Sequence, residues 1–232
     1  MASKVCPYCG KPYPMVTIPA LWDIPARTFQ SNVCGCEGER RASDELHYRQ
    51  RLEDRERILC KAGIPQIYWD IPEDATYLDA VNDGGLFIHG LVGRGKTWLS
   101  VATMKAWMNR NRGRRAVFTD AMGFFSHIRK SYDGGDTERE AMWRFIGTDL
   151  LVFDDFGKGR PSEWSLERIE DLVQERYTEG RPTIFTSQWA GSDLIARLGE
   201  GGSVESATAI VSRIVQRCKT VELTGPDRRM QR

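Results

Sequence analysis

The sequence predicts an α/β protein in which a mainly parallel sheet lies between helices, preceded by a small cysteine-rich module. From about residue 66 of the 232-residue chain, short apolar runs alternate with amphipathic stretches, the pattern of strands joined by crossover helices. Residues 1–38 instead hold four of the six cysteines and few periodic apolar positions. Residues 39–64 are mostly strong helix formers. We therefore expect an amino-terminal module (1–38), a linker helix (39–64) and an α/β domain (65–232).

The elements follow from the spacing of apolar residues along the chain. Helix formers predict a helix over 39–62, ended by Gly63 and Pro65. Apolar runs predict five strands, at residues 86–90, 116–119, 149–154, 182–187 and 220–223. Apolar residues at helical spacing predict the intervening helices, at residues 97–111, 121–131, 137–147, 163–178, 192–198 and 206–217.

The composition favours a soluble, cytoplasmic protein with no membrane partner. Charged residues make up 28% of the chain, hydrophobic residues 41%, and the mean hydropathy is −0.46. No apolar run approaches the roughly 18–20 residues that cross a bilayer, and the amino terminus lacks the apolar core of a signal peptide. The net charge of +1 excludes a strongly basic nucleic-acid coat but not a local basic groove.

The segment GLVGRGKT at residues 90–97 carries the sharpest chemical signal. It matches the phosphate-loop pattern G-x-x-x-x-G-K-[ST] and lies between a predicted strand and a predicted helix, so backbone N–H groups and the helix dipole would favour phosphate. Lys96 would reach the terminal phosphates of ATP, and Thr97 would ligate Mg²⁺. We expect the nucleotide contacts to include Gly90, Val92, Gly93, Arg94, Gly95, Lys96, Thr97 and Trp98.

Adjacent carboxylates end another apolar run, LLVFDDFG at residues 150–157. Asp154 closes the run and is expected to hold the Mg²⁺ shell. Asp155 would orient or deprotonate the attacking water, although an aspartate that follows a strand also suits a turn or a helix cap.

These motifs together resemble the DnaC-type helicase loaders and the IstB-type transposition helper ATPases, both of the AAA+ class. The resemblance covers most of residues 60–232, and the amino-terminal cysteines also look like those of gram-positive and phage loaders. It implies an ATPase that self-assembles in an ATP-dependent way and has a reduced or absent lid domain. The segments that carry it are GLVGRGKT, LLVFDDFG, RPTIFTSQW at 181–189, IVSRI at 210–214 and TGPDRR at 224–229.

The resemblance also implies roles for three residues outside the two motifs. Gln188 would sense the γ-phosphate, where the family more often has Asn, or would only cap a strand end. Arg213 matches the arginine finger that enters the neighbouring subunit's ATP site, which would make it catalytic with Lys96 and Asp155. Arg229 matches the second sensing arginine, with the adjacent Arg228 as the alternative. Each arginine could instead be a solvated surface residue.

Cysteine pairs near the amino terminus predict a zinc site. Cys6 and Cys9 flank Pro-Tyr, and Cys34 and Cys36 flank one glycine. Four thiolates suit tetrahedral Zn²⁺ in a closed structural site, although C-x-C is tighter than the usual C-x₂-C. A redox C-x-x-C or unrelated free thiols are the alternatives.

The segment FFSHIRKSYDGG at residues 124–135 interleaves aromatic and basic residues, which suits single-stranded DNA bound without sequence preference. Arg129, Lys130 and Tyr132 are the expected contacts, or else a solvated helix end. Phe124 and Ile128 have helical spacing and are expected in the core. The basic stretch at 110–115 is either a second contact or a solvated loop.

The predicted function is that of an ATP-dependent loader, which binds ATP and single-stranded DNA and delivers a replicative DNA helicase. The amino-terminal zinc module would contact the helicase. The alternatives are a transposition helper that passes target DNA to a transposase, and a nucleotide-gated adaptor that hydrolyses little ATP. A small chain with a variant zinc knuckle is typical of a phage or mobile element.

Overall fold

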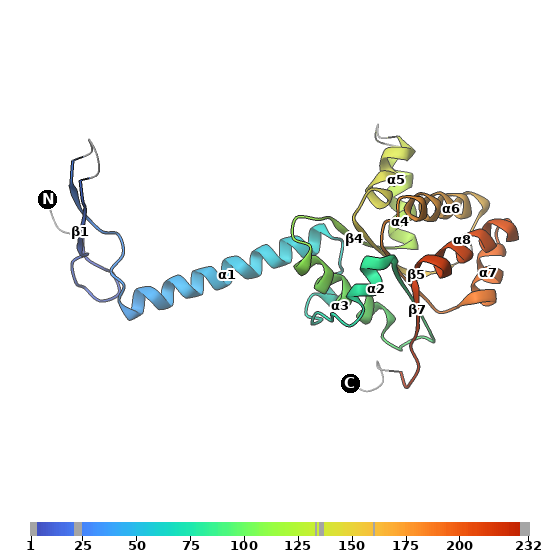
Figure 1. The fold of residues 1–232 in the computed structure, drawn as a ribbon, viewed down its shortest axis with the longest axis horizontal. Coiled ribbons are helices and arrows are strands. Elements are labelled where there is room, and N and C mark those ends of the chain that lie inside the picture. The colour runs from blue at the N-terminus through green and yellow to red at the C-terminus, as the bar shows by residue number, and fades with distance from the viewer. Residues whose placement is uncertain (1–3, 21–24, 133, 135–136, 160, 228–232) are drawn as a thin grey trace. The chain divides into compact units, whose positions relative to one another are not determined.

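The computed structural model describes residues 4–20, 25–132, 134, 137–159 and 161–227. It divides into two compact units, Met1–Arg57 and Ile58–Arg232. Helix α1 (Glu37–Lys61) runs across the boundary between them (Figure 1). No helix in the described ranges combines the length and apolar character needed to span a bilayer.

The second unit is built on a parallel sheet. In the described residues the sheet has five strands: β3 (Gly85–His89), β4 (Ala116–Asp120), β5 (Leu150–Phe156), β6 (Thr183–Ser187) and β7 (Lys219–Glu222). Their order across the sheet is β4-β5-β6-β3-β7, and every neighbouring pair is parallel. Because the strands are parallel, their carboxyl ends all meet at one edge. The predicted α/β class and the five predicted strands are confirmed.

Helices cover both faces of this sheet. Alternate strand residues point to opposite faces, so Leu86 and Ile88 pack in one apolar cluster and Phe87 in the other. The Leu86 face is covered by α2 (Leu78–Asp83) and α3 (Lys96–Arg110). The Phe87 face is covered by α4 (Ala121–Ser131), α5 (Glu138–Ile146), α6 (Glu163–Thr178), α7 (Gly191–Gly199) and α8 (Val204–Arg217). Helix α2 and a 3₁₀ turn at Gln66–Tyr68 have no counterpart among the predicted elements, because each is less than two helical turns long.

A buried arginine ties the loops at the amino edge of the sheet. Arg176 of α6 is only 2% exposed, and burial lowers its pKa to about 9. Its guanidinium donates to the carbonyl oxygens of Phe145, Ile146, Thr148 and Pro182 at 2.6–2.9 Å. Burial of a cation is tolerated here because backbone acceptors replace the lost water.

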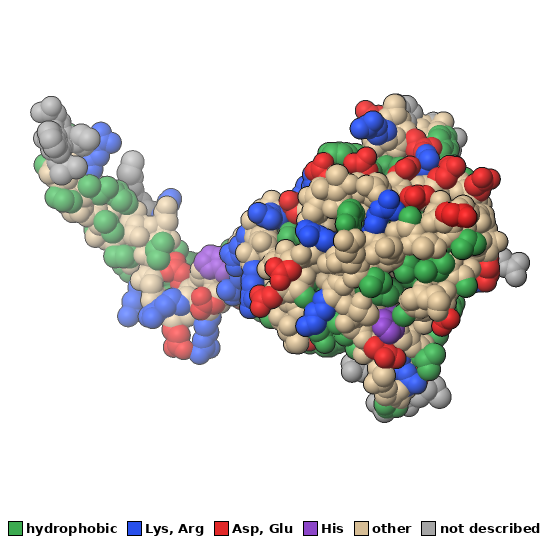
Figure 2. Space-filling view, turned by 45° about the vertical axis from the view of Figure 1, so that its right-hand side comes forward, with side chains coloured by type: hydrophobic (Ala, Val, Ile, Leu, Met, Phe, Trp, Pro, Cys, Tyr) green, Lys and Arg blue, Asp and Glu red, His purple; other side chains and the backbone are tan. Residues whose placement is uncertain are grey.

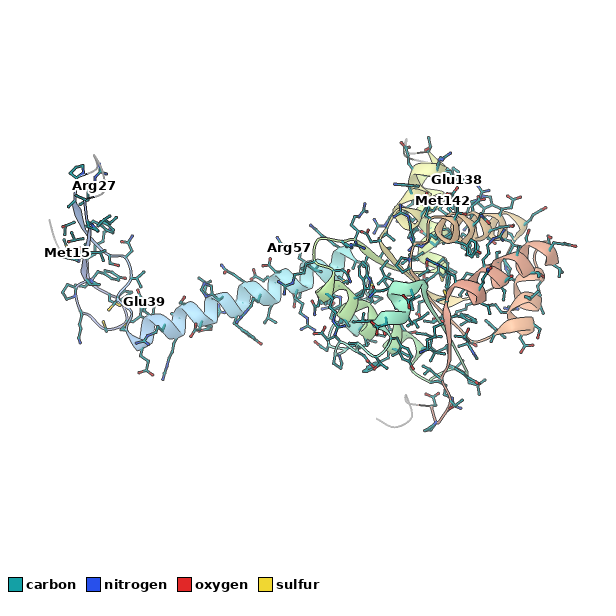
Figure 3. All side chains as sticks on the ribbon, in the orientation of Figure 1. Met15, Arg27, Glu39, Arg57, Glu138 and Met142 are labelled. Atoms are coloured by element: carbon teal, nitrogen blue, oxygen red, sulfur yellow. The ribbon has the colours of Figure 1, made fainter. Side chains whose placement is uncertain are left out.

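The first unit has little apolar core of its own. It contains an antiparallel hairpin of β1 (Met15–Ile18) and β2 (Arg27–Gln30) followed by α1; Figure 3 labels Met15 and Arg27 on its two strands. Figure 2 shows apolar side chains on its surface. The exposed apolar residues include Val5, Tyr8, Met15, Ile18, Phe29 and Val33. Its fold therefore depends on contacts other than apolar burial.

Candidate nucleotide and metal sites

The phosphate-loop motif forms the predicted strand–loop–helix unit. The loop leaves β3 after His89, and α3 begins at Lys96 with Gly95 as its N-cap in the left-handed region at φ 89°, a conformation that only glycine adopts without strain. At Gly90 a Cβ would lie 2.4 Å from the carbonyl oxygen of Leu223, so the close approach of the chain after β7 also requires glycine. The amino terminus of α3 is thus held open toward the loop, as an anion site requires.

The Lys96 side chain folds back over the loop. Its Nζ donates to the carbonyl oxygens of Gly90 at 2.7 Å and Leu91 at 2.9 Å, and the residue is buried. The ammonium therefore lies inside the loop whose backbone N–H groups would bind a phosphate, close enough to contact that phosphate as well. The neighbouring loop residues Val92 and Trp98 are more exposed, at 49% and 37%.

Thr97, Asp154 and Thr186 form a hydrogen-bonded cluster at the carboxyl edge of the sheet. The Thr97 hydroxyl donates to the Asp154 carboxylate at 3.0 Å, and the Thr186 hydroxyl donates to it at 2.6 Å. The cluster joins α3, β5 and β6. A hydroxyl and a carboxylate offer the oxygen ligands that Mg²⁺ prefers, so these groups fit the ion that the sequence predicts.

Burial raises the pKa of Asp154. Hydrogen bonds from Thr186 and Thr97 oppose the shift, whereas the nearby carboxylates of Asp155 and Asp120 add to it. Folding therefore disfavours the ionised carboxylate, and a bound cation would relieve that cost. This electrostatic setting suits a cation site.

Asp155 directly follows in an unusual backbone conformation. Its φ of 52° is the only positive value among the described non-glycine residues, and the β5–β6 register shifts between Phe153 and Phe156. The Asp155 N–H donates to Thr186 Oγ1 at 2.9 Å, which fixes the turn. The Asp155 side chain, 29% exposed, pairs with Lys158 Nζ at 2.6 Å. Strain held by tertiary contacts is typical of functional positions.

Gln188 follows β6 and lines a cavity of about 360 Å³ with Gly90, Arg94 and Glu222. The predicted sensor therefore shares a cavity with the phosphate loop. Asp227 also reaches this region, because a Cβ at Gly93 would lie 2.0 Å from Asp227 Oδ1. Arg228 and Arg229 themselves lie outside the described residues.

Arg213 lies at the other edge of the sheet. It lines a small cavity with Gly84, Thr183 and Cys218, next to where β3 and β6 begin. A five-residue strand spans roughly 15 Å, so Arg213 is remote from the phosphate loop of its own chain. Its Nη1 atom is buried and has no hydrogen-bond partner among the described residues.

The four amino-terminal cysteines converge. Their sulfur atoms all lie within 4.8 Å of one another, with Cys6–Cys36 at 3.8 Å and Cys9–Cys34 at 3.5 Å. A tetrahedron of thiolates around zinc, with bonds of about 2.3 Å, separates its sulfur atoms by about 3.8 Å. The donor set and its spacing therefore fit zinc.

The start of α1 supports this cluster. Glu39, labelled in Figure 3, accepts hydrogen bonds from the N–H groups of Cys34 and Gly35 at 2.7 and 2.6 Å. Its own N–H donates to Cys36 Sγ at 3.4 Å. Such outer contacts fix ligand orientation and stabilise negative sulfur.

The predicted DNA contacts lie on and just beyond α4. Phe124 and Ile128 are fully buried, as expected of core residues. Arg129 lies over the Trp164 ring at 5.3 Å and, with Lys130, lines a cavity of about 590 Å³. Tyr132 is exposed, and its hydroxyl donates to Glu138.

Sequence reasoning missed Thr186 and Lys158. Thr186 is a fully buried polar residue within an apolar strand, a signal that was available in TIFTS but resembles ordinary β-propensity. No sequence pattern marked Lys158, because it is the turn after β5 that brings it next to Asp155.

Comparison with known proteins assigns the family. A family model described as IstB-like ATP binding protein matches residues 76–232. The chain belongs to this family. No curated protein sequence matches it. The parallel five-stranded α/β fold of the second unit agrees with that ATP-binding family.

The solved structures agree on the fold. The DnaC helicase loader matches with 24% identity and a TM-score of 0.57, over 69% of this chain and all of that one. DnaI matches with 23% identity and a TM-score of 0.51, over 77% and 82%. The replication initiator DnaA bound to AMPPCP and single-stranded DNA matches with 19% identity and a TM-score of 0.51, over 69% of this chain and 46% of that one.

Replacing Asp154 by Asn should stabilise the protein in the absence of nucleotide. The raised pKa means that the folded state disfavours the charge, so the neutral amide should add about 0.5–2 kcal/mol to the free energy of unfolding at pH 7.5. The gain should vanish below about pH 3, well under the ordinary Asp pKa of about 3.9, where the carboxyl is protonated in both the folded and unfolded states. Urea titrations at both pH values measure it.

The exposed Asp83 provides the control. Asp83→Asn should leave the urea unfolding curve unchanged at both pH values. A destabilised Asp154→Asn variant at pH 7.5 would show that the hydroxyl contacts outweigh the burial of charge.

Proposed function

We propose that this chain is an ATP-dependent helicase loader that binds ATP and single-stranded DNA and delivers a replicative DNA helicase. The observation that carries the proposal is the cluster of Thr97, Asp154 and Thr186 beside Lys96 and Asp155, in a fold that matches all of the solved chain of the DnaC helicase loader. The membership in an ATP-binding family supports the nucleotide, and the DnaC and DnaI matches support the helicase.

In this proposal, each catalytic residue acts through the position of its charged or polar atoms. Lys96 neutralises the terminal phosphates, aided by the loop amides of Gly93, Gly95 and their neighbours. Mg²⁺, when bound to Thr97 and Asp154, supplies positive charge against the phosphates. Asp155 accepts a proton from the attacking water.

Sensing is assigned to the residues around the loop. Gln188 responds to the γ-phosphate from the cavity that it shares with Arg94. The second sensor is Arg229 or Arg228, which follow Asp227, a residue that packs on the loop.

Arg213 is proposed to complete the ATP site of a neighbouring copy. It lies at the sheet edge opposite its own phosphate loop, and its Nη1 is a buried donor without a partner in the described part of the chain. Shared sites would make assembly depend on ATP.

Single-stranded DNA is assigned to the α4 surface, through Arg129, Lys130 and Tyr132. The cations would contact phosphates, and exposed aromatic rings would stack on bases. The match to DnaA bound to single-stranded DNA supports a polynucleotide ligand. The zinc module is assigned to the helicase contact, since its exposed apolar side chains suit a protein partner.

Two other functions remain candidates. The IstB-like family match favours a transposition helper that passes target DNA to a transposase. The ion pair between Asp155 and Lys158 favours an adaptor with little hydrolysis, because it occupies the proposed base. Helicase capture separates the loader from the helper, and ATP turnover separates both from the adaptor.

The full chain should bind a replicative helicase in the presence of ATP and hydrolyse ATP with a rate that single-stranded DNA increases. Lys96→Ala should weaken binding of a fluorescent ATP analogue at least about tenfold, since it removes the charge in the loop. Lys61→Ala, which changes an exposed lysine of α1, is the control. Capture of a transposase in place of a helicase would reject the loader.

One zinc ion should be held per chain by Cys6, Cys9, Cys34 and Cys36. Cys9→Ser should release the metal, measured by elemental analysis, and should unfold the first unit while nucleotide binding persists. Cys60→Ser, at an exposed cysteine outside the cluster, should retain full zinc. Metal-free protein with four titratable thiols, prepared without chelator, would count against the site.

Arg213→Ala chains should bind ATP but hydrolyse it at least about a thousandfold more slowly. Mixing them with inactive Asp155→Asn chains should restore activity, because some interfaces then combine an intact acid with an intact arginine. Arg110→Ala, at an exposed arginine, provides the control for loss of charge. Absence of recovery in mixtures shown to co-assemble would mean that Arg213 does not act across an interface.

A further inference from the structure

Lys158 holds the carboxylate that the proposed mechanism needs. Its Nζ lies 2.6 Å from Asp155 Oδ2, and its N–H donates to the Asp155 carbonyl at 3.0 Å, which closes the turn after β5. The contact also raises the pKa of Lys158, chiefly through the hydrogen bond to Asp155, so the ammonium stays charged. The Asp155 carboxylate therefore points to the lysine, whereas a general base must be within hydrogen-bond reach of the attacking water.

The backbone of Asp155 is held by contacts that do not involve the Lys158 side chain. Its N–H donates to Thr186, which also binds Asp154, and its positive φ is set by that turn. Release of Lys158 would therefore free only the Asp155 side chain and leave the phosphate-loop cluster undisturbed. The ion pair can act as a switch on one catalytic group without rearranging the fold.

The same lysine lines the large cavity between α4 and α6. The cavity holds about 590 Å³, within the range of about 300–1,000 Å³ that accommodates organic ligands. Arg129, Lys130 and Lys158 contribute to its lining, Phe125 offers an aromatic ring, and the described lining residues include no carboxylate. The amino terminus of α6, capped by Ser162, adds N–H groups at its rim. These features suit a phosphate with an adjoining base.

Lys158 can therefore be drawn from Asp155 to a ligand in this cavity. Its side chain is 64% exposed, and exposed ion pairs of this kind are weak and readily replaced. The four-carbon stem lets the ammonium move without the backbone. A polynucleotide phosphate next to Arg129 and Lys130 would compete for it with a charge equal to that of Asp155.

We propose that Lys158 is a positioning residue that restrains Asp155 until a single-stranded DNA phosphate in the α4–α6 cavity takes its ammonium. The proposal rests on the proposed function, since it assumes ATP hydrolysis by Asp155 and DNA bound along α4. It adds a mechanism by which DNA bound at the α4 surface increases the rate of ATP hydrolysis. Hydrolysis is thus slow until DNA is bound.

The test measures steady-state ATP hydrolysis by the full chain, with and without oligothymidylate, in low salt. Lys158→Met keeps the stem and removes the charge, so the turnover number without DNA should rise about two- to fivefold, the range that an exposed pair supports. The KM for ATP should not change, and DNA should no longer stimulate. Lys158→Arg should restore both the low basal rate and the stimulation.

Lys61→Met, at an exposed lysine outside the cavity, should behave as wild type. Lys130→Met should require more oligothymidylate for half-maximal stimulation but reach the same maximal rate. A Lys158→Met variant that keeps a wild-type basal rate and full stimulation would overturn the inference while leaving the proposed function standing. A wild-type chain that neither hydrolyses ATP nor binds oligothymidylate would overturn both.

Discussion

The buried carboxylate of Asp154 is the constraint around which the second unit is organised. It accepts hydrogen bonds from hydroxyls on α3 and β6, and the Thr186 hydroxyl in turn accepts the N–H that fixes the next residue. One ionisable group thus sets the relative position of phosphate loop, central strand and proposed base. The raised pKa of this carboxyl is the cost of that arrangement, and it is acceptable because the site is built to receive positive charge.

The parallel sheet also keeps groups at the carboxyl ends of its strands apart from groups at the amino ends of the same chain. All strand carboxyl ends lie at one edge, so the phosphate loop, the acidic pair and Gln188 gather there. Arg213 lies within the last crossover, on α8 between β6 and β7, and is at the amino edge among cations such as Arg176, Arg181 and Arg217. A cationic edge and an acidic, phosphate-binding edge on one molecule are complementary in charge. This difference in charge supports the proposal that copies meet head to tail, the heterologous geometry that forms rings or filaments.

The parts that the sequence predicted are those with local signals. The phosphate loop, the strand before Asp154 and the long helices all follow from glycine placement, apolar runs and helical spacing. The β1–β2 hairpin was not predicted because residues such as Thr17 and Thr28, whose hydroxyls pair across it at 2.9 Å, form no apolar alternation. Thr186 and Lys158 were missed because their roles depend on partners 32 and 3 residues away in a turn whose shape is tertiary. The role proposed for Arg213 comes from the family resemblance, because residue spacing alone does not single out this arginine.

The first unit obtains its order from chemistry other than apolar burial. Among the described residues of that unit, Cys6 is buried while most apolar side chains are exposed, so little hydrophobic free energy opposes chain entropy. Helix α1 relies on local pairs such as Arg41–Glu37 and Arg49–Glu45, each worth only about 0.3–0.5 kcal/mol. A metal bound by four thiolates would supply what these contacts cannot, because its binding free energy is coupled directly to folding. If the metal stabilises the unit, its apolar residues need not form a core and can stay exposed to bind a partner protein. This links the cysteine cluster to the proposed capture of a helicase.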